Sequence, residues 1–175
     1  MKPGRKILVA AVAALLLVSL FYFPLRRKFS LHEGALINSG QSKRNAVIFF
    51  VNQDGKIVGR DTEIVSGATV LDDIKSLITQ ESLARAGGLL NAIPVGTAVR
   101  NVFIDENKCV YIDFERSIID RHVGGTEGES LTLEALKRTM AENFPELDSM
   151  KLLVEGKELA SLAGHITTRL KLKVK

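Results

Sequence analysis

The chain has 175 residues, of which 25% are charged, with a formal net charge of +4 and a single cysteine. Six of the 24 basic residues and none of the 20 acidic ones lie in the first 28 positions, so the rest of the chain is slightly acidic. This distribution excludes a basic nucleic-acid-binding domain. One cysteine also excludes an intramolecular disulfide framework.

An apolar run over residues 7–23 dominates the N-terminus, with three basic residues on each flank. A helix of its 17 residues would span roughly 26 Å, close to the hydrocarbon core of a bilayer at about 30 Å. No small residues follow the run where a signal peptidase would cut. We therefore expect residues 1–28 to be an uncleaved single-pass membrane anchor, with a cleaved signal peptide as the alternative.

The flanking charges do not set the orientation of this anchor, because each flank carries three basic residues. The expected orientation is therefore the usual one for segments of this kind. We expect a short tail in the cytoplasm and the domain on the extracytoplasmic side of the cytoplasmic membrane, in the periplasm or cell-wall space. Residues 29–45 are predicted to form a polar tether with glycines and serines. If this tether is flexible, its ends lie roughly 23 Å apart.

The globular domain is predicted to span residues 46–175, in one unit large enough for its own core. Its first half reads as a hairpin of strands 46–51 and 56–65 around an Asp-Gly turn. A helix follows, with a Thr69–Asp72 capping box at its start and Gly87 and Gly88 at its end. Val70, Ile74, Leu77 and Ile78 have the spacing of a helix face.

The second half is predicted to repeat this order. Residues 98–105 and 109–114 read as paired strands, and 115–129 as an irregular loop. Ser130 is expected to cap a second helix that ends before Pro145. One face of that helix is expected to carry Leu133, Leu136, Met140 and Phe144. Strands over 150–155 and 168–175 flank a loop at 156–167, and the last strand alternates Leu170, Leu172 and Val174 with basic residues.

The order ββαββαββ predicts an α+β fold, with two helices packed on one face of a mixed or antiparallel sheet. On the strand over 109–114, alternation turns Val110, Ile112 and Phe114 toward the helices. Cys109 and Tyr111 then lie on the opposite face. Cys109 is expected to be buried and inert.

Three patterns were considered as sites of chemistry. The Gly124–Ser130 segment lies where phosphate loops lie, but it has two glutamates and no lysine, so a loop and helix start explain it better. His32, His122 and His165 lack metal-ligand spacing. Asp113 and Glu115 are neighbours on one strand, which rarely suits a facing carboxylate pair. We expect no catalytic residue, metal or cofactor.

Several short motifs stand in order along the chain, at residues 87–97, 110–114, 124–129, 136–139, 153–156 and 162–165. Taken together, they resemble the GerMN domain, the sporulation-and-germination module. The Ile-Pro-x-Gly-Thr segment and the closing Gly-His pair are the most distinctive. Two features depart from the family: Glu115 stands where a small hydroxyl residue is usual, and the lipoprotein cysteine is missing.

The resemblance covers roughly residues 46–174 and implies a non-catalytic, membrane-attached envelope domain that supplies protein–protein contacts. On this hypothesis the partner is another envelope protein or a second copy of the chain, with no nucleic acid involved. The open sheet face would be the interaction surface. Its candidate residues are Tyr111, Cys109, Lys151, Arg169, Lys171 and Lys173.

An alternative hypothesis is a domain that binds or hydrolyses cell-wall glycan or peptide. The loops 115–129 and 156–167 would then line a cleft that contains Asp113, His122 and His165. These three side chains would have to lie within reach of a hydrogen bond or one bridging water to share a proton.

Overall fold

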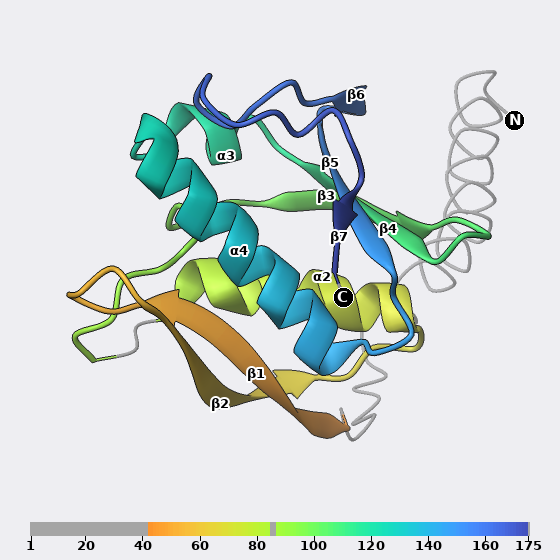
Figure 1. Cartoon of the computed structure of the whole chain (residues 1–175). Coiled ribbons are helices and arrows are strands. Elements are labelled where there is room, and N and C mark those ends of the chain that lie inside the picture. The colour runs from red at the N-terminus through yellow and green to blue at the C-terminus, as the bar shows by residue number, and fades with distance from the viewer. Residues whose placement is uncertain (1–41, 85–86, 175) are drawn as a thin grey trace, which may run out of the picture. The chain divides into compact units, whose positions relative to one another are not determined.

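The computed structural model describes residues 42–84 and 87–174 (Figure 1). The predicted anchor over 1–28 and most of the tether lie outside the described residues. Within the described part of the chain, no helix is long and apolar enough to cross a membrane. The elements are β1 (Lys43–Val51), β2 (Ile57–Val65), α2 (Val70–Leu83), β3 (Val99–Ile104), β4 (Cys109–Phe114), α3 (Ser117–Asp120), α4 (Gly125–Asn143), β5 (Ser149–Val154), β6 (Lys157–Glu158) and β7 (Leu172–Lys173).

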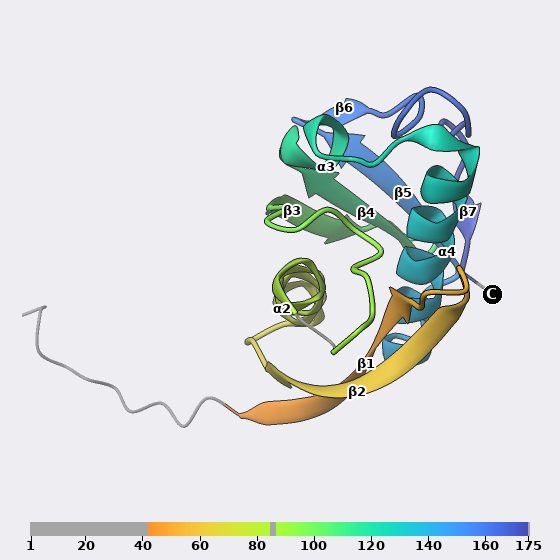
Figure 2. The same cartoon turned by 90° about the vertical axis from the view of Figure 1, so that its left-hand side faces the viewer.

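The strands form two sheets rather than one. β1 and β2 pair antiparallel as a separate hairpin, and the second sheet has the order β3-β4-β5-β6 with β7 on β5. The β4–β5 pair is parallel and the other pairs are antiparallel, so the second sheet is mixed. This confirms the predicted α+β fold. The helices α2 and α4 lie between the mixed sheet and the hairpin, and α2 is seen end-on between β3 and the hairpin in Figure 2.

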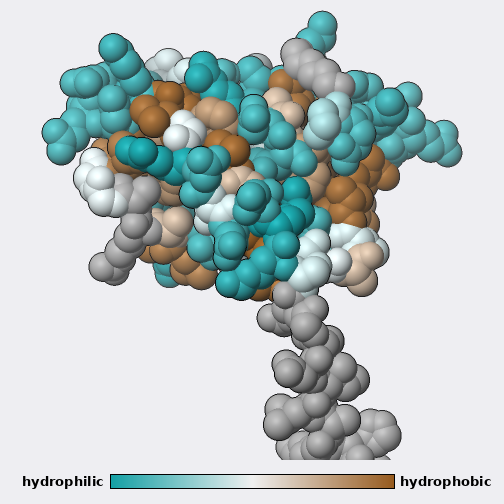
Figure 3. All heavy atoms as spheres, turned by 90° about the horizontal axis from the view of Figure 1, so that it is seen from below, coloured by the Kyte–Doolittle hydropathy of each residue, from teal (hydrophilic) through white to brown (hydrophobic). Residues whose placement is uncertain are grey.

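The core lies where both sheets meet the helices. Val110, Ile112 and Phe114 of β4 are completely buried, as alternation predicts. The four predicted positions on the second helix are also buried, from Leu133 through Phe144. The hairpin adds Ile48 and Phe50 from the other side. Seen from below, the hairpin side shows hydrophobic residues as separate patches among hydrophilic ones (Figure 3).

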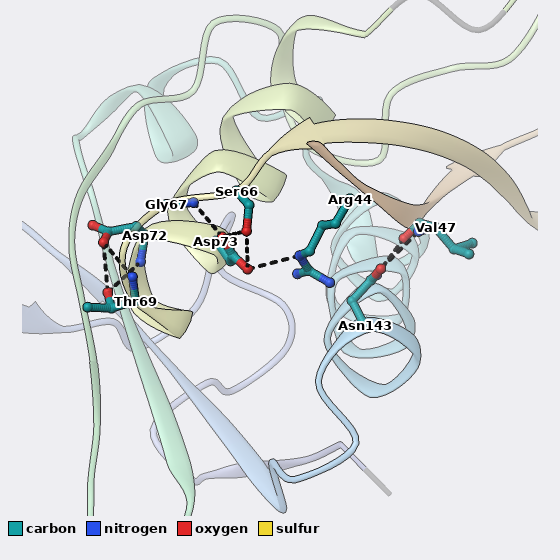
Figure 4. A network of polar contacts seen from close by, with 8 residues as sticks. All are labelled: Arg44, Val47, Ser66, Gly67, Thr69, Asp72, Asp73 and Asn143. Atoms are coloured by element: carbon teal, nitrogen blue, oxygen red, sulfur yellow. Dashed lines mark hydrogen bonds and ion pairs between the residues drawn. The ribbon is translucent and has the colours of Figure 1, made fainter. Parts of the chain in front are cut away.

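A polar network joins β1 to the start of α2 and the end of α4 (Figure 4). The Thr69–Asp72 capping box is present as predicted. Asp73 accepts the Gly67 N–H at 2.7 Å and lies 2.9 Å from Arg44 Nε. The Arg44 guanidinium carbon in turn lies 4.9 Å from the centre of the Phe144 ring.

The outer edge of β1 is closed by α4. The Asn143 side chain accepts the Val47 N–H at 2.9 Å and donates to the Val47 carbonyl at 2.7 Å, as a neighbouring strand would. Thr139 Oγ1 accepts the Phe49 N–H at 3.3 Å. At the hairpin end, Val51 forms a backbone bridge with Leu90. Most backbone groups on this edge from Val47 to Val51 are therefore paired without a third strand.

Both helices differ from their predicted bounds. α2 ends at Leu83 and not at Gly87, because Ala84 is already extended, with ψ of 139°. α4 begins at Gly125, so Ser130 lies inside the helix and is not its cap. Gly124 and Gly125 have φ of 75° and 76°, a conformation that glycine adopts without steric cost. The glycine pair, not a serine cap, therefore sets the entry into α4.

The predicted C-terminal strand over 168–175 is mostly absent. Only Leu172–Lys173 pairs with β5, and Leu170 is 73% exposed rather than half-buried. Thr168 explains the shortening, because its N–H donates to the Ala160 carbonyl at 2.9 Å and its hydroxyl to the Leu159 carbonyl at 2.7 Å. These bonds hold the chain in a loop until it reaches β5.

Candidate functional site

The face of the mixed sheet opposite the helices is the candidate site. Alternation along β4 places Tyr111 there, and the strand registers put Phe103 of β3 and Lys151 of β5 directly beside it. β7 reaches the same region, since Lys173 pairs in register with Ser149 of β5. Four strands thus contribute side chains to one surface.

Two aromatic side chains form the centre of this face. The rings of Phe103 and Tyr111 are stacked, with centroids 4.9 Å apart and an angle of 12° between their planes. Phe103 is 44% exposed, and Tyr111 is half-buried. Stacked pairs add about 0.5–1.5 kcal/mol beyond the area they bury. The pair is therefore a fixed and partly exposed apolar surface.

Asp105 connects this aromatic pair to the C-terminal segment. Its Oδ1 accepts the backbone N–H groups of Asn107 and Cys109, each at 2.9 Å. Its Oδ2 accepts the Tyr111 hydroxyl at 3.2 Å and Lys171 Nζ at 2.8 Å. Lys171 Nζ also lies 5.4 Å from the centre of the Tyr111 ring, within the range of a cation–π contact.

The opposite charges of Asp105 and Lys171 stabilise each other. The hydrogen bond from Lys171, helped by the Cys109 N–H, lowers the pKa of Asp105 to about 2. The same hydrogen bond to Asp105 raises the pKa of Lys171 above its ordinary value. Both groups therefore stay charged near neutral pH, and their opposite charges offset one another at the centre of the face.

The structure places the six predicted face residues in different environments. Tyr111 and Lys171 lie together, as described. Lys151 is 9% exposed, and its Nζ is bound to Glu158 at 2.6 Å. Cys109 is completely buried, so its side chain does not reach the surface. Arg169 and Lys173 are exposed.

Sequence reasoning missed Phe103 and Asp105. The same alternation rule, applied to residues 99–105, would have placed Phe103 opposite the core positions Val102 and Ile104. Asp105 carried a weaker signal: an aspartate before a turn often accepts backbone N–H groups two residues on. Its contact with Lys171 had no sequence signal, because the two residues are 66 positions apart.

A second polar cluster joins two of the sequence motifs. The Glu129 carboxylate, completely buried near the start of α4, accepts backbone N–H groups from Ala163, His165 and Ile166. Burial acts to raise the pKa of Glu129, but these three donors outweigh it and leave the pKa below its ordinary value. The carboxylate therefore holds the loop over 161–166 against α4.

His122 takes part in a chain of hydrogen bonds between loops. The Gly124 N–H donates to Nδ1 at 3.0 Å, so the ring proton is on Nε2, which lies 3.1 Å from Thr132 Oγ1. The Thr132 hydroxyl donates to the Ala92 carbonyl at 2.6 Å. Burial lowers the pKa of His122, with the Glu129 charge opposing it. The neutral ring therefore links the glycine turn before α4 to the Ile93-Pro94 loop.

The alternative cleft finds little support in these contacts. Asp113 accepts the Gly156 N–H at 2.8 Å and lies 3.8 Å from Arg100 Nε. Both ring nitrogens of His122 are occupied, and the His165 backbone N–H is bound to Glu129. Among the residues that the structure describes, no group of three potential ligands could hold a metal ion. The side chains of Asp113 and His122 therefore bind other structural partners, and the contact of His165 is made by its backbone.

Comparisons with known proteins give the same family as the sequence motifs. The family model described as Germane, sporulation and spore germination, matches residues 47–160. No curated protein matches the chain.

Three solved structures share the fold. The first GerMN domain of the sporulation protein GerM from Bacillus subtilis is 17% identical, with a TM-score of 0.59, over 74% of this chain and 97% of that one. The tandem GerMN domains of the same protein are 20% identical, with a TM-score of 0.57, over 74% of this chain. A predicted lipoprotein from Clostridium perfringens is 17% identical, with a TM-score of 0.52, over 75% of this chain and 88% of that one.

The extent of these matches defines one module. The chain spans 46% of the tandem-domain structure but nearly all of the single domain, so it contains one copy. The family model covers most of the described unit. The chain therefore belongs to the Germane family, and residues 47–160 form a single GerMN domain.

Proposed function

We propose that this chain is a membrane-anchored GerMN domain that works outside the cytoplasm as a non-catalytic protein–protein interaction or assembly module of the cell envelope. Its docking surface is the open face of the mixed sheet. The observation that carries this proposal is the stacked Phe103–Tyr111 pair, fixed to Lys171 through Asp105 on a surface that no helix among residues 42–84 and 87–174 covers (Figure 2).

The geometry of this cluster favours binding. Tyrosine is enriched among the residues that dominate protein interfaces. Side chains held in place before binding lose less conformational entropy when a partner arrives. Because Asp105 offsets the Lys171 charge, and Glu158 offsets that of Lys151, the centre of the face is aromatic rather than strongly basic. It suits a partner with a matching apolar patch.

The membrane location is supported by the sequence and by one similar structure. Residues 7–23 have the length and flanking charges of a membrane segment. The similar protein from Clostridium perfringens is a predicted lipoprotein, and a lipid is another form of membrane attachment. In this proposal the helix of the present chain replaces the lipid, since the single cysteine lies inside the domain.

Paired substitutions test the proposed face. Tyr111→Glu and Lys171→Glu are made in the full-length protein in mild detergent, with Lys157→Glu as the matched control. Lys157 pairs in register with Val154, a core residue, and so lies on the other face of the sheet. We expect both face variants to fold and to lose self-association or partner capture, measured by light scattering across a concentration series and by affinity capture. The control keeps both properties.

The face is the wrong surface if both variants associate and capture partners as the unmodified protein does. A strict monomer at all concentrations, with a captured partner, favours an assembly with another envelope protein. Concentration-dependent oligomers that the two substitutions abolish favour self-assembly.

A further inference from the structure

The hairpin has one open edge, on β2. The residues of β1 at positions 47, 49 and 51 direct their backbone groups to α4 and Leu90, away from β2. Antiparallel pairs alternate between bonded and non-bonded positions. Their register partners on β2 therefore point their N–H and C=O groups away from β1. These outward positions are Ile57, Gly59, Asp61, Glu63 and Val65.

The two edges of the hairpin differ in how these groups are paired. On β1 the outward groups of Val47 and Val51 are bound by Asn143 and Leu90, and the Phe49 N–H is bound by Thr139. On β2 no hydrogen bond from residues 42–84 or 87–174 reaches the outward backbone groups. Unpaired strand edges are templates on which an extended chain can add as a further strand.

A groove runs beside this open edge, between β2 and α2. It consists of two hollows of about 460 and 450 Å³ that meet at Gln80. Buried Ile48, Phe50 and Ile64 contribute an apolar floor, and α2 contributes polar residues such as Thr79. A strand added to β2 would place every second side chain into this groove. An open strand edge beside a helix is a geometry in which extended peptides bind.

A second copy of β2 is a poor occupant, because its charges clash. Twofold antiparallel pairing must join outward positions to one another. The registers that overlap seven or more residues then place Asp61 opposite Asp61, Arg60 opposite Arg60, or Asp61 opposite Glu63. Like charges directly opposite each other are destabilising. The edge is thus protected against its own copy while remaining open to a different sequence.

We propose that β2 binds an extended segment of a partner protein as an added strand. Asp61 and Glu63 are exposed on the outer face of the hairpin. Glu63 already pairs with Lys43 of β1 at 3.1 Å, so the Asp61 charge in particular favours a basic residue opposite it. The alternate residues face the groove and should be apolar. The partner is therefore a strand in which lysine or arginine alternates with aliphatic residues. This surface is separate from the aromatic face of the mixed sheet.

The probe is a labelled heptapeptide with blocked ends that alternates lysine with leucine, compared with a peptide in which glutamate replaces lysine. The full-length protein is titrated in one mild detergent, so peptide uptake into micelles is common to all variants. We expect saturable binding of the lysine peptide by fluorescence anisotropy. Asp61→Pro removes an outward N–H without touching the β1 ladder, and we expect it to weaken binding at least tenfold.

A charge reversal keeps the test valid if Asp61→Pro does not fold. The double variant D61K/E63K should prefer the glutamate peptide over the lysine peptide by at least tenfold. E106K/E146K changes the same charge at exposed positions in the loops before β4 and β5 and should bind as the unmodified protein does, as should Tyr111→Glu. Three results would each overturn the proposal. The unmodified protein could show no saturable binding of the lysine peptide, the D61K/E63K variant could bind both peptides equally well, or the control variant could weaken binding as much as the test variants do.

Discussion

Glu81 carries a buried carboxyl group, and the cost of burying it is not offset by hydrogen bonds of good geometry. Its side chain is completely buried in α2, and neither oxygen has a hydrogen-bond partner of good geometry in the described part of the chain. Burial raises the pKa of Glu81 to about 8 from 4.5, although the nearby Thr139 hydroxyl acts to lower it. Between those two values the folded protein holds a proton that the unfolded chain has released. Stability from this group therefore falls as pH rises through that window.

Glu81→Gln should remove this dependence. Because glutamine cannot ionise, we expect the variant to be more stable than the unmodified protein by roughly 1–3 kcal/mol at pH 7.5. Below about pH 5 the two should differ little. Urea unfolding at pH 5, 6, 7 and 8 measures the difference. If the two proteins change in parallel over that series, the buried carboxyl is already ionised or better paired than the structure indicates.

Glu129 shows what sequence reasoning could not find at the scale of one residue. In the sequence it is only a glutamate near a helix start, whereas in the structure it accepts three N–H groups that lie 34 to 37 positions away. A contact at that separation leaves no local pattern. The Gly124–Glu129 motif and the Leu162–His165 motif are thus explained together, because one binds the other.

Glu129→Ala should release the loop over 161–166. Three N–H groups would lose their partner, and we expect a loss of about 2–4 kcal/mol in the free energy of unfolding. Glu129→Gln keeps one acceptor oxygen and should lose less. Hydrogen exchange at Ala163, His165 and Ile166 should accelerate in both variants, more in the alanine one. Unchanged protection at these amides would show that the loop is held by other contacts.

At the scale of elements, strands were easier to predict than helix ends. The strand over 109–114 has the predicted bounds, because alternation and a preceding turn are local signals. The start of α4 depends on a glycine pair in a left-handed conformation and on Glu129, so a serine was mistaken for its cap. The C-terminal segment alternates like a strand, yet Thr168 binds a loop carbonyl and delays pairing until Leu172.

Substituting Asn143 tests whether α4 closes the edge of β1. Asn143→Leu removes both hydrogen bonds to Val47, and we expect a loss of about 1–2 kcal/mol in unfolding free energy. The Val47 amide should exchange faster. Glu142→Ala, at the exposed neighbouring position, serves as the control and should change neither quantity. An Asn143→Leu protein with unaltered Val47 protection would mean that α4 does not pair this edge.

At the scale of the whole molecule, the sequence predicts the fold class and the inward faces but not the division into two sheets. The order of helices and strands along the chain does not determine which strands pair with one another. Among the described strands, β1 and β2 pair only with each other, while the parallel β4–β5 pairing joins segments separated by α3 and α4. The helices are therefore covered by strands on both sides, where the sequence analysis expected one sheet.

Core truncations should show that the layers form one cooperative unit. Ile112 of the mixed sheet and Leu136 of α4 are both completely buried. Replacing either by alanine should cost about 2–5 kcal/mol, from lost burial and a residual cavity. His32→Ala, in the predicted tether, should cost almost nothing. Thermal or urea unfolding measures all three. A small cost for Ile112→Ala would place that side chain outside the common core.

The most direct test of the central claim is site-specific photo-crosslinking in the cells that make this protein. A photoreactive phenylalanine analogue replaces Phe103 on the open sheet face, and the same analogue replaces Lys157 on the other face as the control. The account predicts a protein adduct at position 103, either with another envelope protein or with a second copy, and little or none at position 157. Equal adducts at both positions, or none at position 103, would contradict the claim that this face is the docking surface.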